Sequence, residues 1–546
     1  MKKSYPLILL FLFNLFIQST YGQNPLNYNK EKWLELAEKN KPVLTEQVIR
    51  PVGVVELVKD ATSFQGWRMK PVASIDSVYK TSFKKINHLI VDFGNHYTGY
   101  FSMRIGQMGS TPDGPIRLKV TFAEVPAELA QSFDPYPGGV SRAWLQDEVI
   151  TVMDPLSEVK LARRVACRYL KIELLGSSPY FDFTLSNLQL TAVTAVSRMP
   201  EPISSSSDQM IKDIDRVGLN TLKECMQTVY EDGPKRDRRL WIGDLFLESL
   251  ANAYSFKNYG LTKRCFYILA GLSDDRGYLH GTIFETPTPH PQAKQFLMDY
   301  ALLYNVALKE YLVASGDHAT AQDLWPVAKR QLDIVRAYVE ADGLINFEKA
   351  SADWWLFFDW KDGLNRAAAI QGLSVYALKE TYEMAKLLNK QDELKEIPAL
   401  IKKMTEASRK LYNKKINLFE SGKDKQISYA SQIWMILGGV LSKEESQKTL
   451  NALLGAKDAV RPGGPYMYHY FIQALINSDL KSEAKKQLVA YWGGMVTKGA
   501  DTFWEVYDPT NDLLSPYNFY PVNSYCHAWS CTPVYFIRKY PEIFQN

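Results

Sequence analysis

The chain has 546 residues, which is enough for two or three domains. Hydrophobic residues make up 46% of it and charged residues 23%, the balance of an ordinary globular protein. The formal net charge of +4 is small for this length, and Lys and Arg do not gather into a basic stripe, which argues against nucleic acid as a partner.

The first 22 residues predict a cleavable secretory signal peptide. Lys2 and Lys3 precede an apolar run from Pro6 to Ile17, and small and polar residues follow it at 19–22. The run is too short to span a membrane comfortably, no cysteine follows it that would accept a lipid anchor, and no later segment approaches 18 uninterrupted apolar residues. We therefore expect an exported protein without a membrane span, either periplasmic or secreted.

Residues 50–200 are predicted to form an antiparallel β-sandwich, after a helical or extended segment at 23–49. Short apolar or alternating runs recur there between turn signals such as Gly94-Asn95, a spacing typical of such a domain. The runs are 89–93, 100–104, 117–122, 149–152, 169–174 and 188–193. A linker rich in Pro and Ser, from Pro200 to Ser206, ends this domain.

From Asp208 the hydrophobic period becomes that of helices, so residues 201–546 are predicted to form a helical domain. The expected helices cover 208–229, 243–258, 262–273, 296–315, 319–341, 366–388, 391–413, 428–441, 443–455, 465–478, 480–494 and 524–540. Consecutive helical hairpins in six antiparallel pairs would close into an (α/α)6 barrel. The expected architecture is thus multidomain β + α.

The five cysteines do not form a zinc pattern. They are Cys167, Cys225, Cys265, Cys526 and Cys531, and none stands in a CxxC or a Cys/His arrangement. We predict neither a metal site nor a cofactor. Cys526 and Cys531 are the nearest pair for a disulfide in an exported protein, but the count is odd, and buried free thiols are expected for most of the five.

Residues 232–244, Asp-Gly-Pro-Lys-Arg-Asp-Arg-Arg-Leu-Trp-Ile-Gly-Asp, crowd polar groups between two expected helices. Three carboxylates, three guanidinium groups, a lysine and an indole surround two glycines and a proline. A carboxylate held among arginines can be tuned to donate a proton or to bind sugar hydroxyls. A solvated, salt-bridged loop is an equally good explanation of the charge alone.

A second unusual segment is Thr502-Phe-Trp-Glu-Val-Tyr-Asp508. Glu505 and Asp508 lie among aromatic residues there, and desolvation beside aromatic faces raises the pKa of a carboxyl group and suits it to proton transfer. A carboxylate that caps a helix would give the same pattern. His527 follows between two aromatic residues, where a histidine is more often structural than catalytic.

A barrel of hairpins brings distant loops onto one rim, so the 232–244 loop and Glu505 are expected to face each other. Two carboxylates across a sugar-sized gap are the minimal machinery of glycoside hydrolysis, in which one protonates the leaving oxygen and the other activates water or attacks. This pairing is the sharpest chemical hypothesis that the residues support.

With these motifs the chain resembles the α-L-rhamnosidases of glycoside hydrolase family 78, over nearly all of its expected mature length. The 232–244 segment resembles the family's signature, Thr502-Phe-Trp-Glu505 its Trp-Glu motif, and Ser524-Tyr-Cys-His-Ala-Trp529 the motif after it. Supporting similarities lie at 91–94, 98–100 and 123–125 for the accessory sandwich, and at 299–303 and 358–360 within the barrel.

The resemblance implies an (α/α)6 catalytic barrel that hydrolyses terminal L-rhamnose with inversion, so a rhamnose-containing glycan is the expected partner. It assigns Glu505 as general base and Asp237 as general acid. Residues implied to bind or shape the site of the sugar are Asp232, Arg236, Trp241, Asp244, Asp359, Trp360, Trp504 and His527. Two features depart from the common pattern: Arg238 stands where many members have a glutamate, and the chain ends at Asn546 without the usual C-terminal β domain.

Two other functions remain open on the sequence. A polysaccharide lyase acting at a rhamnose–uronate linkage would use Tyr or His with basic residues, and the segment supplies Tyr230, Lys235, Arg236, Arg238, Arg239 and, later, His527. A degenerate carbohydrate-binding protein would explain Arg238 at the glutamate position. The Glu505 motif, for which a mere binder has no need, favours an enzyme. The glycosidic linkage, the leaving group and the oligomeric state stay undetermined.

Overall fold

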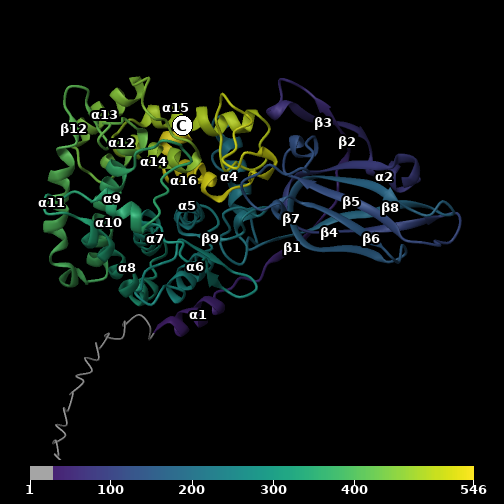
Figure 1. The fold of residues 1–546 in the computed structure, drawn as a ribbon, viewed down its shortest axis with the longest axis horizontal. Helices are drawn as coiled ribbons and strands as arrows, with labels where there is room; N and C mark the ends of the chain where they lie inside the picture. The colour runs from purple at the N-terminus through teal and green to yellow at the C-terminus, as the bar shows by residue number, and fades with distance from the viewer. Residues whose placement is uncertain (1–28, 546) are drawn as a thin grey trace, which may run out of the picture.

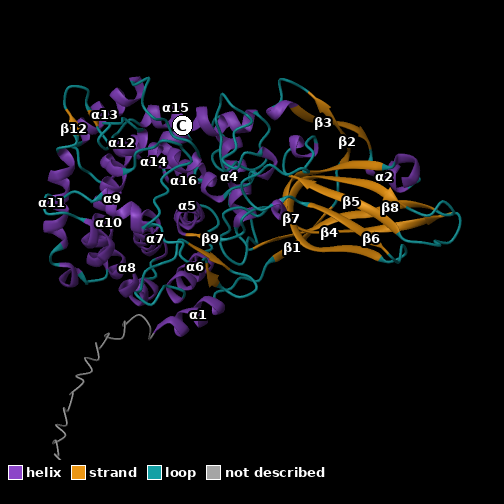
Figure 2. Cartoon of the chain, viewed as in Figure 1, coloured by secondary structure: helices purple, strands orange, loops and turns teal. Residues whose placement is uncertain are grey.

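The structure is a computed structural model that describes residues 29–545, so the expected signal peptide at 1–22 lies outside the described residues. A β-sheet domain forms one end of the molecule and a larger helical region the other (Figures 1 and 2). None of the helices in the described part of the chain combines the length and the apolar character that crossing a bilayer requires.

The sheet domain is antiparallel throughout, as the sequence predicted. Its eight strands are β1 (Thr45–Ile49), β2 (Gly53–Lys59), β3 (Trp67–Ala73), β4 (His88–Met108), β5 (Ile116–Ala123), β6 (Asp147–Val152), β7 (Glu158–Gly176) and β8 (Asp182–Thr194). Their order is β1-β8-β4-β7-β5-β6, and β2 pairs with both β3 and β4. Alternate residues of each long strand, such as Leu118, Val120 and Phe122 of β5, are buried in a core of their own, as a sheet with one face covered requires.

The expected turn at Gly94-Asn95 is wrong: the strand continues through it. The runs 89–93 and 100–104 both belong to β4, whose pairing with β7 shifts register between Asp92 and Tyr97. Gly94 has φ +83°, a left-handed conformation that glycine adopts without the steric cost of a side chain. A bulge of this kind bends the strand and increases its twist without ending it, so one strand replaces two.

The helical region contains the six expected hairpins. Their outer helices are α4 (Gln209–Cys225), α6 (Tyr259–Gly271), α8 (His318–Tyr338), α11 (Ile397–Arg409), α13 (Lys443–Gly455) and α15 (Lys481–Thr497). The inner helices are α5 (Ile242–Ala253), α7 (Met298–Ser315), α10 (Ala367–Leu387), α12 (Tyr429–Leu437), α14 (Pro465–Asn477) and α16 (Pro533–Lys539). Each inner helix contacts the next, directly or, from α14 to α5, through α16 and the turn before it, so the ring closes. The short helices α9 (Phe347–Asp353) and α17 (Pro541–Phe544) are additions.

The helix expected at 524–540 begins only at Pro533. Residues 524–527 form an extended loop, and His527 has φ −134° and ψ 129°. The backbone N–H groups of this loop bind groups elsewhere in the fold: that of His527 donates to Phe503 O at 2.9 Å and that of Ala528 to Asp232 O at 2.8 Å. These tertiary hydrogen bonds replace the helical ones, and they place the loop beside residues 232–244.

Helix α1 (Lys30–Lys39) precedes the sheet in sequence but packs against α6 of the helical region (Figure 1). Trp33 is fully buried there, and Arg264 donates to Ala37 O at 2.6 Å. The five cysteines are all free and buried, and Cys526 Sγ lies 3.9 Å from Cys225 Sγ.

Candidate active site

A pocket with an empty volume of about 380 Å³ lies where the 232–244 loop meets residues 505–529. This is the size of a small-ligand site. It is lined by Asp232, Arg236, Asp237, Trp241, Asp244, Leu297, Tyr300, Trp355, Phe357, Trp360, Glu505, Tyr517, His527 and Trp529. The two segments that the sequence marked as unusual therefore meet across one cavity, although about 270 residues separate them.

Asp232 organises the loop that carries the other acids. Its Oδ1 accepts a hydrogen bond from the N–H of Arg239 at 3.0 Å, and its Oδ2 accepts one from the N–H of Asp237 at 3.3 Å. At Gly233 a Cβ atom would lie 2.3 Å from Arg236 O, so only glycine allows the loop to close this tightly. The buried carboxyl group of Asp232 thus fixes the backbone positions of Asp237 and Arg239.

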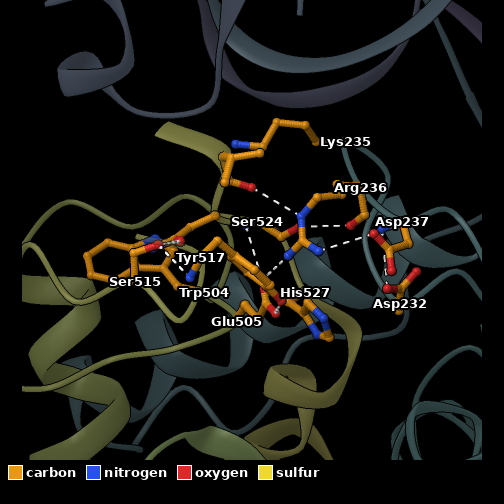
Figure 3. Close-up of polar contacts among 12 residues, drawn as sticks. Asp232, Lys235, Arg236, Asp237, Trp504, Glu505, Ser515, Tyr517, Ser524 and His527 are labelled. Carbon is orange, nitrogen blue, oxygen red and sulfur yellow. Dashed lines mark hydrogen bonds and ion pairs between the residues drawn. The ribbon is translucent and has the colours of Figure 1, made fainter. Parts of the chain in front are cut away.

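Arg236 joins the two candidate catalytic carboxylates (Figure 3). Its Nη1 donates to Asp237 Oδ1 at 3.1 Å and its Nη2 to Glu505 Oε2 at 2.5 Å. The guanidinium is buried, donates from Nε to Val522 O at 3.1 Å, and lies 4.1 Å from the ring centre of Tyr517. Because these contacts hold the planar guanidinium in place, its N–H groups fix the relative positions of the two acids.

Glu505 is held as a carboxylate. Burial raises its pKa, but the neighbouring Arg236, together with hydrogen bonds from Tyr517 and Arg236, outweighs burial and leaves the pKa below its ordinary value. The hydroxyl of Tyr517 donates to Oε1, and the N–H of Ser524 donates to Oε2 at 3.4 Å. The expectation that aromatic neighbours raise this pKa is therefore wrong, because it took no account of a cation from a distant segment.

Asp237 is the more open of the two acids. Its side chain is 17% exposed, whereas that of Glu505 is 2% exposed, and Arg239 Nη1 lies 3.8 Å from its Oδ2. It therefore meets the cavity from the loop side, with Arg236 between it and Glu505. Two carboxylates separated in this way, one open and one enclosed, suit a proton donor and a base for water.

The floor of the pocket carries carboxyl groups that keep their protons. Burial, reinforced by the charge of Asp237, raises the pKa of Asp232 to about 8. Burial, with Asp232 and Glu505 close by, raises the pKa of Asp244 well above its ordinary value. Burial lowers the pKa of His527 to about 4, so its ring is neutral, and its Nδ1 lies 3.6 Å from Asp244 Oδ1. Protonated carboxyls and a neutral imidazole both donate and accept, which is what sugar hydroxyls require.

Six lining residues were missed by the sequence analysis: Leu297, Tyr300, Trp355, Phe357, Tyr517 and Trp529. They are apolar or aromatic, and Phe357 stacks on Trp529 with ring centres 5.6 Å apart. Tyr300, Phe357 and Trp529 lie in or beside the segments 299–303, 358–360 and 524–529, whose similarity to the family pattern pointed to this part of the chain. Trp355 belongs to the aromatic run Trp354-Trp-Leu-Phe-Phe358 that leads into 358–360, whereas nothing local marks Tyr517.

Two of the expected sugar-site residues do not line the pocket. Asp359 is buried, accepts a hydrogen bond from the N–H of Gly463 at 2.6 Å, and has its pKa raised to about 7 by burial. Trp504 is buried against Phe64, with ring centres 4.0 Å apart. The structure places both behind the wall to which Trp360 and Glu505 belong, so they support the pocket rather than face it.

Of the residues proposed for a lyase, Arg236 and His527 line the pocket, but Tyr230, Lys235, Arg238 and Arg239 do not. Lys235 is buried against Glu124 and Glu128, and the hydroxyl of Tyr230 is hydrogen-bonded to Thr262 at 2.7 Å. Arg238, at the position where many family members have a glutamate, turns away and donates to Arg164 O of the sheet domain at 2.6 Å. Arg238 therefore does not replace an acid in the pocket, where Asp237 lies instead.

Two family models match the chain. Residues 51–192 match the glycosyl hydrolase family 78 alpha-rhamnosidase N-terminal domain, and residues 203–540 match the bacterial alpha-L-rhamnosidase six-hairpin glycosidase domain. No curated protein matches the chain.

Among solved structures, a Klebsiella oxytoca rhamnosidase with rhamnose bound is 38% identical, with a TM-score of 0.90 over 94% of this chain and 99% of that one. A family 78 rhamnosidase of Bacillus sp. GL1 is 20% identical, with a TM-score of 0.69 over 82% of this chain and 46% of that one. The Streptomyces avermitilis α-L-rhamnosidase complexed with L-rhamnose is 14% identical, with a TM-score of 0.64 over 91% of this chain and 44% of that one. At these lower identities the likeness shows the fold alone, and the chain spans just under half the length of both proteins.

Proposed function

The chain belongs to glycoside hydrolase family 78, the α-L-rhamnosidases, and from that premise we propose that it removes terminal α-L-rhamnose from a glycan with inversion. Asp237 is the general acid and Glu505 the general base. The observation that carries this assignment is the single guanidinium of Arg236, bound to both carboxylates at the pocket wall.

In the proposed reaction the sugar enters the pocket and the leaving group stays outside. Glu505, an ionised carboxylate, takes a proton from a water molecule that attacks the anomeric carbon. The bond to the leaving oxygen breaks, and Asp237 supplies the proton that this oxygen needs. Inversion follows because water attacks from the face opposite to the leaving group.

Rhamnose is the proposed occupant because the pocket suits a small deoxy sugar and the Klebsiella oxytoca relative holds rhamnose. Asp232, Asp244 and His527 provide groups that donate and accept, and they bind the hydroxyls. Phe357 and Trp529 provide an apolar wall, against which the carbon face and the methyl group of the sugar pack.

The test uses 4-nitrophenyl α-L-rhamnoside with the wild type, Asp237→Asn and Glu505→Gln. Loss of a positioned acid or base lowers the rate about 10²–10⁴-fold, so both variants are expected to lose kcat on that scale. Proton NMR of the first product formed by the wild type is expected to show β-L-rhamnose. First appearance of the α anomer would exclude inversion, and wild-type kcat in either variant would exclude the corresponding role.

We also propose that the protein is exported to the periplasm or the medium. The support is the pair Lys2 and Lys3 before the apolar run that ends at Ile17. The amino-terminal sequence of protein recovered from the extracytoplasmic fraction of a producing bacterium is expected to begin just after Gly22. Retention in the cytoplasm with Met1 in place would refute export.

A further inference from the structure

A buried cluster of charged residues joins the sheet domain to the loop that carries Asp237. Lys235 Nζ lies 2.9 Å from Glu124 Oε2 and 2.5 Å from Glu128 Oε1, and all three side chains are at most 3% exposed. Glu124 follows β5, and Glu128 lies in the 3-10 turn Pro126–Leu129. Charges buried this deeply are stable only when each is paired.

Every carboxylate oxygen in this cluster has a partner. Glu124 Oε1 is hydrogen-bonded to His96 Nε2 at 3.0 Å, and Oε2 accepts from the N–H of Tyr525 at 2.7 Å as well as from Lys235. Glu128 Oε2 accepts from the N–H of Glu124 at 2.7 Å. Carboxylates whose oxygens are all held in this way specify one arrangement of the segments that they join.

The network holds both sides of the proposed catalytic centre. Lys235 immediately precedes Arg236 and Asp237 (Figure 3). Tyr525 immediately follows Ser524, whose N–H donates to Glu505 Oε2 and whose hydroxyl donates to Arg236 O at 2.8 Å. Glu124 Oε2 thus binds the side chain of Lys235, two residues before the acid, and the N–H of Tyr525, which follows the residue that contacts Glu505.

We propose that Glu124 of the sheet domain is a positioning residue of the glycosidase, which acts through Lys235 to hold Asp237 at the leaving oxygen. The inference rests on the proposed role of Asp237 as general acid. A proton donor must come within about 2.6–3.2 Å of the oxygen it serves, and a displacement of about 1 Å can cost on the order of 10²-fold in rate. The sheet domain is then part of the catalytic machinery and not a separable module.

The experiment compares full-length Glu124→Gln, Lys235→Met and their double variant with the wild type. The matched control is Asp215→Asn, which makes the same carboxylate-to-amide change in a buried pair, because Asp215 accepts from Arg538 at 2.8 and 2.7 Å and neither residue lines the pocket. Thermal unfolding is measured for each variant, and kcat and KM are measured with 4-nitrophenyl and 2,4-dinitrophenyl α-L-rhamnosides.

With the 4-nitrophenyl substrate, kcat is expected to fall at least about tenfold in Glu124→Gln and Lys235→Met, while KM stays within about twofold because the sugar pocket is unchanged. The loss is expected to shrink with the dinitrophenyl substrate, whose leaving group needs little protonation. The double variant is expected to be no worse than the poorer single one, because the two residues act as one unit. Asp215→Asn is expected to lose stability but not kcat.

Wild-type kcat in Glu124→Gln, or a loss equal for both substrates and matched by Asp215→Asn, would overturn the inference. If Glu124→Gln does not fold, Lys235→Met tests the same contact from its other side. Asp237→Asn in the same assay separates the two proposals. If it keeps wild-type kcat, the acid assignment fails and the inference fails with it, whereas an impaired Asp237→Asn beside an unimpaired Glu124→Gln refutes only the positioning role.

Discussion

Arg236 is bound to Glu505 at 2.5 Å, in a contact where both side chains are buried and the two residues come from segments 269 positions apart. Burial alone would favour a protonated glutamate. The guanidinium reverses this preference and keeps the pKa of Glu505 below its ordinary value. The contact therefore keeps Glu505 ionised, as its proposed role as base requires, and it contributes to stability only while Glu505 is ionised.

Replacement of Arg236 by Met is expected to destabilise the fold by about 3–5 kcal/mol at neutral pH, because it leaves a buried carboxylate without its cation. The folded-state pKa of Glu505 is depressed in the wild type, so the pair's contribution is present above the unfolded pKa and is lost as the pH falls through the folded one. Urea unfolding at pH 7 and at about pH 4 checks this: the deficit is expected to be smaller at the lower pH.

A deficit that does not change with pH would show that Arg236 stabilises by packing alone. Arg239→Met is the control, because its guanidinium lies no closer than 3.8 Å to the nearest carboxylate and binds Gln292 instead. Its deficit is expected to be smaller than that of Arg236→Met.

Removal of the Tyr517 hydroxyl is expected to move the acid limb of the pH–activity profile to higher pH. Tyr517 donates to Glu505 Oε1, and this hydrogen bond lowers the pKa of the base. Tyr517→Phe loses the donor, so the pKa of Glu505 rises, by up to about one unit, and the base is protonated at a pH where the wild type is active. The measurement is kcat/KM for an aryl rhamnoside from pH 3 to pH 8. Tyr300→Phe, which removes a hydroxyl from the pocket wall but not from Glu505, is expected to leave the limb in place.

Glu248 is expected to be replaceable by Gln with a gain in stability. It lies one turn after Asp244 in α5, is fully buried, and neither of its carboxyl oxygens has a hydrogen-bond partner among the described residues. Burial, with Asp244 and Asp232 close by, raises its pKa well above the ordinary value. The folded state therefore holds a proton that the unfolded state releases as the pH rises, which costs stability progressively above the unfolded pKa.

Glu248→Gln removes that cost, so the gain in the free energy of unfolding is expected to grow with pH, to about 1–3 kcal/mol at pH 8. Denaturant unfolding at pH 5 and at pH 8 measures it. Equal stability of the two proteins at both pH values would mean that a polar partner satisfies the carboxyl group of Glu248.

Much of the fold follows from local pattern. The helical period from Asp208 onward predicts the six hairpins, and the alternating runs predict the antiparallel sheet. The errors lie where tertiary contacts decide. The strand β4 passes through Gly94 because glycine permits a bulge, and residues 524–527 are extended because their N–H groups bind Glu505, Glu124 and Phe503 rather than helical carbonyls.

Only part of the site was predicted from the sequence, again because tertiary contacts decide the rest. Asp237 and Glu505 stand in segments whose composition is unusual by itself. Tyr517 stands in a segment with no such feature, and only the closed ring brings it to the pocket. The pKa of Glu505 is the clearest case: burial raises it, whereas Arg236, which is distant in sequence and adjacent in space, lowers it.

Trp355 is expected to contact the leaving group and not the rhamnose. Its side chain lines the pocket but remains 44% exposed, and a second hollow, lined in part by Phe296 and Arg366, lies on its other side. An indole at the mouth can stack on the sugar next to the bond that breaks, and such stacking contributes about 0.5–1.5 kcal/mol. Trp355→Ala is therefore expected to raise KM for a rhamnosyl disaccharide roughly two- to tenfold. KM for methyl α-L-rhamnoside, whose leaving group is too small to reach the indole, is expected to stay constant. Tyr180→Ala serves as the control, because Tyr180 belongs to the sheet domain and its side chain is more exposed than that of Trp355. It is expected to change KM for neither substrate. An equal rise in KM for both substrates would instead place Trp355 against the rhamnose itself.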